Sequence, residues 1–241
     1  MPTNKPTSAG GWQYITAVAG GLAHEIKNPL STINLNLQLL EEEWADPQTP
    51  KERRTCRKLQ ILQKEVQRLT QTLEDFLRFT RAEKLQLQPT DVNDLAAEIA
   101  EFIGPELARA KIELLEQYSQ DLPKCMADPR LLKQAILNVI LNAQQAMPEG
   151  GEFILRTSLA GGAVNIEVID TGGGIPQGVQ DKVFDVFFST KEKGSGLGLP
   201  MAKRIVEQQG GTVTFHSEPG RGTDFVIRIP ACNPEPGGGQ E

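Results

Sequence analysis

The chain has 241 residues, 39% hydrophobic and 23% charged, a composition typical of a globular protein with room for one or two cores. Its net charge of −6 argues against nucleic-acid binding. It has no run of about 18 apolar residues and no apolar N-terminal stretch like that of a signal peptide. We therefore expect no membrane segment in this chain and a cytoplasmic location, with a membrane anchor elsewhere in a longer parent protein as the alternative. Three cysteines, an odd number, exclude a closed disulfide framework.

The first predicted element is a helical hairpin over residues 12–84. Apolar residues recur in steps of three and four, first at Ile15, Val18, Leu22, Ile26, Ile33, Leu37, Leu40 and Trp44, then at Leu59, Leu62, Val66, Leu69, Leu73 and Phe76. A break at 45–50 contains two prolines, which disfavour helix before them. A single hairpin cannot cover its own apolar stripe. We therefore expect a homodimer that forms a four-helix bundle.

The second half of this hairpin is basic. Residues 51–84 carry ten basic and five acidic side chains, whereas the segments on both sides are acidic. Such a run is most often a solvated helix face. The alternative is a surface that attracts an acidic protein partner.

The pattern changes after residue 85. Helices are expected at 91–110, 128–147 and 197–209, and strands at 112–118, 124–127, 153–158, 164–169, 212–217 and 223–229. Mixed helices and hairpins predict an α/β sandwich with helices on one face of the sheet, so the fold class is α+β. We expect domains at 12–84 and 85–231, with disordered tails at 1–11 and 232–241.

His24 is the first candidate for chemistry. It lies two residues from both Leu22 and Ile26, so helical geometry points it away from the apolar stripe. An exposed imidazole can act as a nucleophile, and Glu25 beside it can accept the Nδ1 proton. For a lone histidine, a merely solvated side chain remains the more common explanation.

Two polar blocks downstream suggest a nucleotide site. Asn138 and Asn142 lie four residues apart on one face of an otherwise aliphatic helix, and an amide oxygen suits Mg²⁺. Asp170 follows an apolar strand and precedes three glycines, where an acid can accept a hydrogen bond from the amine of adenine. The glycines from Gly194 to Gly198 lead into a helix and can cradle phosphate. Taken separately, each block also fits solvated amides or flexible turns.

Together these motifs resemble the two-component sensor histidine kinases over about residues 12–230. The segment His24-Glu25-Ile26-Lys27-Asn28-Pro29 is similar to the phosphoacceptor motif of that family. The blocks after residue 85 resemble its ATPase domain, of the GHKL (Bergerat) type that is shared with gyrase and heat-shock chaperones. The sequence Phe187-Phe188-Ser189-Thr190-Lys191 is similar to the nitrogen-regulation-type kinases.

The resemblance implies autophosphorylation of His24 from ATP, then transfer to an aspartate in the receiver domain of a response regulator, with phosphatase activity toward that regulator. Glu25 would be the general base, Asn28 would orient phosphate or water, and Asn142 would be the Mg²⁺ ligand. The residues implied for ATP are Asn138, Asn142, Asp170, Gly172, Gly174, Lys191, Gly194, Gly196, Leu197, Gly198 and Thr223.

The sequence departs from the family at Gln144-Gln145, where many relatives carry a basic or aromatic pair, so the burden of phosphate contact shifts to Lys191. Two other classes of protein also fit part of this pattern. A GHKL-type ATPase clamp would hydrolyse ATP without a phosphoprotein and needs no upstream His24-Glu25. A binding scaffold with an inactive nucleotide site is disfavoured by the presence of Asn142 and Asp170.

Overall fold

The structure, a computed structural model, describes residues 9–80, 84–191 and 194–232, with the backbone alone for 9–24. The chain divides into two compact units, a helical unit within 1–83 and an α/β unit formed mainly by 84–190 and 196–241. Most of the predicted tails at 1–11 and 232–241, namely residues 1–8 and 233–241, lies outside the described residues. The first helix already begins at Ala9, which is earlier than expected.

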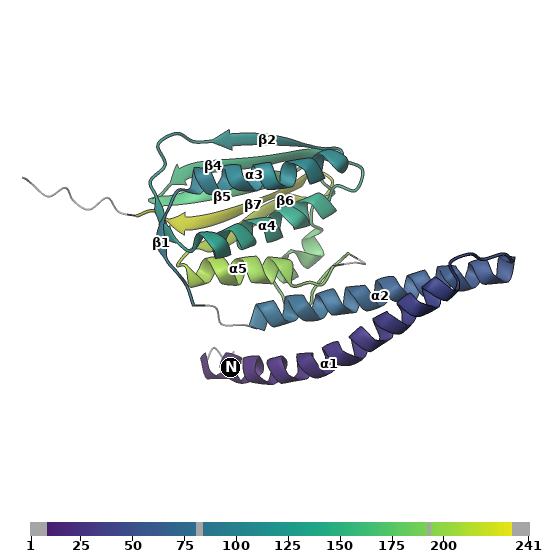
Figure 1. Ribbon diagram of the computed structural model, residues 1–241. Helices are drawn as coiled ribbons and strands as arrows, with labels where there is room; N and C mark the ends of the chain where they lie inside the picture. The colour runs from purple at the N-terminus through teal and green to yellow at the C-terminus, as the bar shows by residue number, and fades with distance from the viewer. Residues whose placement is uncertain (1–8, 81–83, 192–193, 233–241) are drawn as a thin grey trace, which may run out of the picture. The chain divides into compact units, whose positions relative to one another are not determined.

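The helical unit is the predicted hairpin of α1 (Ala9–Glu43) and α2 (Pro50–Thr80) (Figure 1). Pro50 opens α2, and Thr49 before it caps the helix by accepting a hydrogen bond from the Glu52 N–H at 3.2 Å. The Glu52 carboxylate accepts in return from the N–H groups of Thr49 and Gln48. These backbone hydrogen bonds lower the pKa of Glu52.

The hairpin covers only part of its apolar stripe. Leu37 of α1 and Val66 of α2 are each only 8% exposed. Leu62 and Leu69, which alternate with Val66 along the heptad pattern, are about half exposed at 53% and 49%. One row of the predicted seam therefore packs within the hairpin, and the other row faces outward.

The α/β unit is built on a five-stranded sheet in the order β2-β4-β5-β7-β6. The strands are β2 (Ile112–Tyr118), β4 (Gly151–Ala160), β5 (Ala163–Asp170), β6 (Thr212–Glu218) and β7 (Gly222–Pro230). β2 runs parallel to β4, and the other neighbours are antiparallel. A separate pair joins β1 (Gln88–Thr90) to β3 (Cys125–Ala127).

Three helices lie over one face of this sheet, as the sequence predicted: α3 (Val92–Arg109), α4 (Pro129–Gln145) and α5 (Gly198–Gln208) (Figure 1). Alternate strand residues point toward the helices and form the core, and Phe153, Leu155, Ile166, Phe225 and Ile227 are fully buried there. Two elements were not predicted, the short strand β1 and the 3₁₀ helix η1 (Gln177–Lys182). Both are too short to show a periodic apolar pattern.

Asp128 connects several parts of the α/β unit. Its carboxylate caps α4 by accepting from the N–H groups of Arg130 and Leu131. The same carboxylate accepts from the N–H of Gln86 in the segment that precedes β1, and the Asp128 N–H donates to the side chain of Gln209. Asp128 is only 2% exposed, so these bonds satisfy a carboxylate that burial would otherwise penalise.

Candidate functional site

Three polar side chains form a row across neighbouring strands at one end of the sheet. In the register of the sheet, Asp170 of β5 lies opposite Thr223 of β7, and Thr223 lies opposite Ser217 of β6. In each strand, alternate side chains face the helices. These side chains are apolar except for the last one or first one, which is Asp170 in β5, Ser217 in β6 and Thr223 in β7. The sheet thus ends in a polar edge, made by Asp170 and Thr223, which the sequence singled out, and by Ser217, which it did not.

The loop after β5 is held close to this edge. The carboxylate of Asp170 accepts a hydrogen bond from the Gly172 N–H at 2.9 Å. The Gly173 N–H donates to the carbonyl of Ala146 at the end of α4, and the Gly173 carbonyl accepts from Gly220. Gly174 has a φ of 68°, and a Cβ there would lie against the Glu218 carbonyl. The glycines therefore let the loop pass between α4 and the β6–β7 hairpin.

Gly222 is the tightest of these approaches. Its φ is 102°, and a Cβ would overlap the Asp170 carbonyl oxygen. A side chain at this position would displace the backbone that carries Asp170.

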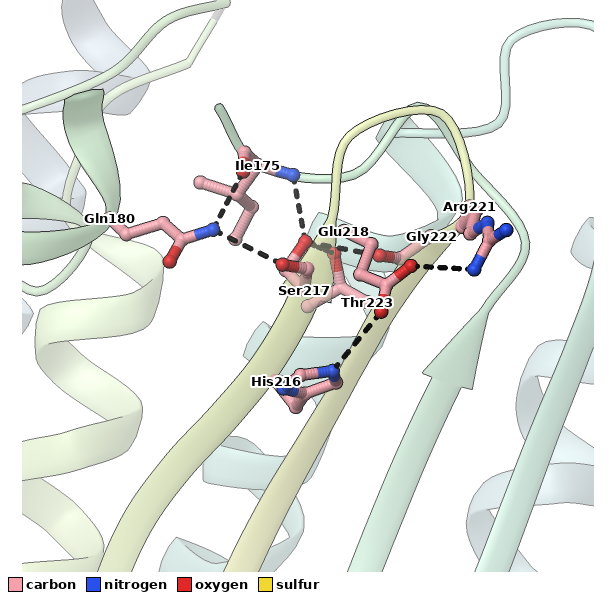
Figure 2. A network of polar contacts seen from close by, with 8 residues as sticks. All are labelled: Ile175, Gln180, His216, Ser217, Glu218, Arg221, Gly222 and Thr223. Carbon is pink, nitrogen blue, oxygen red and sulfur yellow. Dashed lines mark hydrogen bonds and ion pairs between the residues drawn. The ribbon is translucent and has the colours of Figure 1, made fainter. Parts of the chain in front are cut away.

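Ser217 is the centre of a polar network that joins three segments (Figure 2). Its hydroxyl accepts from the Ile175 N–H at 2.8 Å, donates to the Gly222 carbonyl at 3.0 Å and lies 3.0 Å from the Thr223 hydroxyl. The side-chain amide of Gln180 donates to the carbonyls of Ile175 and Ser217. Figure 2 shows these groups meeting where η1, the loop after β5 and the β6–β7 hairpin come together.

The other end of the site is made by two helices. Asn138 and Asn142 lie on one half-buried face of α4. A Cβ added to Gly198, the first residue of α5, would lie 4.0 Å from the Asn138 carbonyl, so the start of α5 is close to α4. Leu197, 2% exposed, precedes α5, and no side chain in the described part of the protein caps this helix. Its first N–H groups suit an anion.

The glycine segment before α5 follows the course that the sequence indicated. Gly196 has a φ of 67°, a Cβ there would lie 2.5 Å from the Phe187 carbonyl carbon, and its carbonyl accepts from the Phe187 N–H at 3.0 Å. Gly194 donates its N–H to the carbonyl of Lys191, which is half-buried. Residues 192–193 of this predicted lid lie outside the described residues.

The Gln144 side chain bonds to a neighbouring helix and is not a candidate ligand for phosphate. Its side-chain amide donates to the carboxylate of Glu106 on α3 at 3.3 Å. This agrees with the expectation that the Gln144-Gln145 pair does not replace the basic pair of many relatives.

The available metal-donor side chains favour a metal ion that the protein and a bound ligand coordinate together. Within the described part of the chain, no three His, Cys, Asp or Glu side chains gather as a metal site. Asn142 carries a neutral amide oxygen and is half-buried on the face of α4 that also carries Asn138. Mg²⁺ normally keeps several waters and binds one or two protein oxygens plus phosphates, so this donor fits Mg²⁺ that arrives with a nucleotide.

The candidate phosphoacceptor residues lie in the middle of α1. The helix continues unbroken through Pro29, which lacks an N–H and therefore leaves the Glu25 carbonyl without its usual helical donor. Glu25 and Asn28 are exposed, and Lys27 forms an ion pair with Glu74 of α2 at 2.9 Å. The side chain of His24, which the sequence predicts to face solvent, lies outside the described side chains.

His216, to which the sequence gave no role, has acidic neighbours in the fold. Its Nε2 lies 3.8 Å from the Glu218 carboxylate, and Asp224 lies opposite it on β7. The His216 side chain is 82% exposed and belongs to the exposed face of the sheet.

The fold and the polar edge define an ATPase domain joined to a helical hairpin, and comparisons with known families agree. Residues 127–233 match the family described as histidine kinase-, DNA gyrase B- and HSP90-like ATPase. Residues 15–85 match the His Kinase A (phospho-acceptor) domain. With both of these domains, the chain belongs to the sensor histidine kinases.

Known proteins with both parts are similar over most of this chain. The sensor histidine kinase ZraS of Escherichia coli (strain K12) is 34% identical over 213 residues, which cover 88% of this chain and 45% of ZraS. Sporulation kinase D of Bacillus subtilis (strain 168) is 35% identical over 223 residues, or 90% of this chain and 42% of that kinase. The chain thus spans less than half the length of these relatives.

Solved structures show the same architecture. Full-length ShkA, crystallised in complex with AMPPNP, superimposes with a TM-score of 0.70 at 29% identity, over 90% of this chain and 46% of ShkA. The histidine kinase ThkA, crystallised with the response regulator protein TrrA, gives a TM-score of 0.67 at 24% identity, over 91% of this chain and 63% of ThkA. Among the described residues of this chain, no helix is long and apolar enough to cross a membrane.

Proposed function

We propose that this chain binds ATP at the polar edge of the sheet, transfers the γ-phosphate to His24 and passes it to an aspartate of a response regulator. The proposal rests mainly on the observation that one chain contains both a phosphoacceptor helix and an ATPase fold. One is a helix with the sequence His24–Pro29. The other is an ATPase fold in which Asp170 and Thr223 face each other. We place the domain limits at 12–84 and 85–231.

The nucleotide would be held at two ends. At the base end, Asp170 accepts from the adenine amine, Gly172 and Gly174 shape the wall, and Thr223 supports the base through water. At the phosphate end, the backbone at the start of α5 suits the anionic groups, because helix N–H groups and the helix dipole favour negative charge. The phosphate-end residues are Asn138, Asn142, Lys191, Gly194, Gly196, Leu197 and Gly198.

Mg²⁺, held by Asn142 together with the phosphates, would offset their negative charge. The chain's own residues carry the transfer. The Nε2 lone pair of His24 forms a bond to the γ-phosphorus as the bond to the bridging oxygen breaks and ADP leaves. Glu25 accepts the Nδ1 proton and so stabilises the charge that develops on the ring.

In the second step, an aspartate oxygen of the partner attacks the phosphorus and the bond to Nε2 breaks. Asn28 orients phosphate in this step, and orients water when the phosphorylated partner is hydrolysed. The exposed basic residues of α2 suit an acidic receiver pocket and would speed its approach: Lys51, Arg53, Arg54, Arg57, Lys58, Lys64, Arg68 and Arg78.

A homodimer would complete the helical unit. The outward row that contains Leu62 and Leu69 is apolar and about half exposed, and a second hairpin would bury it in a four-helix bundle. Light scattering should give the dimer mass for the wild type, and Leu62→Glu with Leu69→Glu should give the monomer mass. A monomeric wild type at micromolar concentration would exclude this assembly.

Incubation with γ-labelled ATP and Mg²⁺ tests the proposal. We expect an acid-labile, alkali-stable label on the protein that is lost in both His24→Gln and Asp170→Asn. Label that persists in His24→Gln would remove His24 as acceptor. The competing ATPase clamp predicts a different result, namely steady release of phosphate with no labelled protein.

A further inference from the structure

The Ser217 hydroxyl forms three hydrogen bonds in the described structure, which is the full capacity of a hydroxyl group. It accepts from the Ile175 N–H at 2.8 Å and shares contacts of 3.0 Å with the Gly222 carbonyl and the Thr223 hydroxyl. A hydroxyl has one proton and two lone pairs. The direction of each bond can therefore be assigned.

Two of the three partners of the Ser217 hydroxyl can play only one role in a hydrogen bond, either donor or acceptor. The Ile175 N–H can only donate, and the Gly222 carbonyl can only accept. Ser217 must give its single proton to Gly222, because a carbonyl offers none in return. The remaining lone pair of Ser217 then accepts from Thr223, so the Thr223 proton points at Ser217 and away from Asp170.

The consequence is that Asp170 and Thr223 present only hydrogen-bond acceptors at the polar edge of the sheet. Thr223, only 4% exposed, keeps its two lone pairs but has no proton left for a ligand. Asp170, only 2% exposed and opposite Thr223 in the sheet, presents a carboxylate. A base edge with an N–H donor is attracted to both acceptors, directly at Asp170 and through water at Thr223, whereas a base carbonyl would face two buried acceptors.

We propose that Ser217 is a specificity-determining residue: it fixes Thr223 as a hydrogen-bond acceptor and so favours adenine over 6-oxopurines. Ser217 acts through Thr223 and is a positioning residue. Gln180 keeps it in place by bonding the backbone carbonyls of both Ile175 and Ser217 (Figure 2). The inference rests on the proposed binding of ATP and adds the cause of base selectivity.

The test compares ATP with inosine triphosphate, in which a carbonyl replaces the amine at position 6. Dissociation constants of both are measured by calorimetry with Mg²⁺ for the wild type, Ser217→Ala, Ser217→Thr and Thr223→Val. In Ser217→Ala the Thr223 hydroxyl is free to turn and donate, so we expect the preference for ATP to fall about tenfold. Ser217→Thr restores the hydroxyl and the preference. Arg221→Ala is the matched control, because Arg221 pairs with Glu218 on the same hairpin, outside the Ser217 bonds.

Thr223→Val keeps the shape of Thr223 and removes its oxygen, so it should also lower the preference for ATP. It keeps the test decisive if Ser217→Ala does not fold. An unchanged ratio of the two dissociation constants in either folded variant would overturn the role of Ser217 while leaving ATP binding intact. A wild type that binds neither nucleotide would overturn both this inference and the proposed function. Loss of affinity for both nucleotides in equal proportion would indicate a structural role alone.

Discussion

Asp170 and Thr223 face each other across two antiparallel strands, and the backbone of Gly222, next to Thr223, lies against the Asp170 carbonyl. The position of the acid is thus set from two directions, by its own loop through Gly172 and by the β6–β7 hairpin. This arrangement makes nucleotide binding sensitive to changes in the hairpin as well as to changes at Asp170 itself.

Replacing Asp170 with Asn should weaken ATP binding by roughly thirtyfold, or about 2 kcal/mol, because the substituted amide brings N–H donors to a buried site that needs an acceptor. Calorimetric titration with ATP and Mg²⁺ measures this. Asp94→Asn, at an exposed acid of α3, is the control and should bind as the wild type does. Equal affinities for Asp170→Asn and the wild type would exclude Asp170 from the site.

Gly222→Ala should abolish ATP binding and lower the melting temperature, because the added methyl group would overlap the Asp170 carbonyl. Gly220→Ala is a matched control: its φ of 79° is also positive, but a Cβ there meets nothing within 4 Å. We expect Gly220→Ala to cost about 1 kcal/mol in backbone strain and to keep ATP binding. Thermal melts with and without ATP separate the two effects. Identical behaviour of the two variants would mean that strain, and not the overlap, is decisive.

Asp224 should make the domain less stable as pH rises. Burial and the nearby Glu167 raise the pKa of Asp224 above its ordinary value of 3.8. The folded state therefore holds its proton more tightly than the unfolded state, and stability falls as pH climbs from 3.8 through the folded pKa. Asp224→Asn removes this penalty, so its melting temperature should exceed that of the wild type at pH 7. The difference should vanish below pH 3.8. A variant that melts lower than the wild type at pH 7 would show that Arg156 and His216 outweigh burial.

Cys125 should resist alkylation in the folded protein. It is fully buried, and burial raises the pKa of its thiol to about 11, so little thiolate exists at pH 8. Iodoacetamide followed by peptide mass spectrometry should modify Cys232 and Cys56, both half-buried, well before Cys125. In denaturant all three should react alike. Rapid modification of Cys125 in the folded state would show that β3 opens readily.

The sequence predicted most of the fold because its elements are long and periodic. The cap at Asp91 and the proline at the start of α4 can be recognised in the sequence, since they depend on neighbouring residues alone. The strands β4 to β7 alternate plainly, and the tight turns between them are rich in glycine. The short strand β1 and η1 carry no such signal.

The site was predictable where a local motif marks it. Asp170 and the glycines were found because they follow a strand or precede a helix. Ser217 and Gln180 were missed, because their roles depend on the register of β6 against β7 and on the position of η1, neither of which a sequence reveals. One signal was available for Ser217: it continues the inward row of Val213 and Phe215 with a polar residue, as Asp170 does in β5.

The most direct test of the account is the location of the phosphoryl group after incubation with ATP and Mg²⁺. Peptides prepared at alkaline pH and analysed by tandem mass spectrometry should carry the group on His24, and the Asp170→Asn protein should carry none. A phosphoryl group on a serine, a threonine or another histidine, or ATP consumed with no modified peptide, would contradict the assignment of His24 as the acceptor.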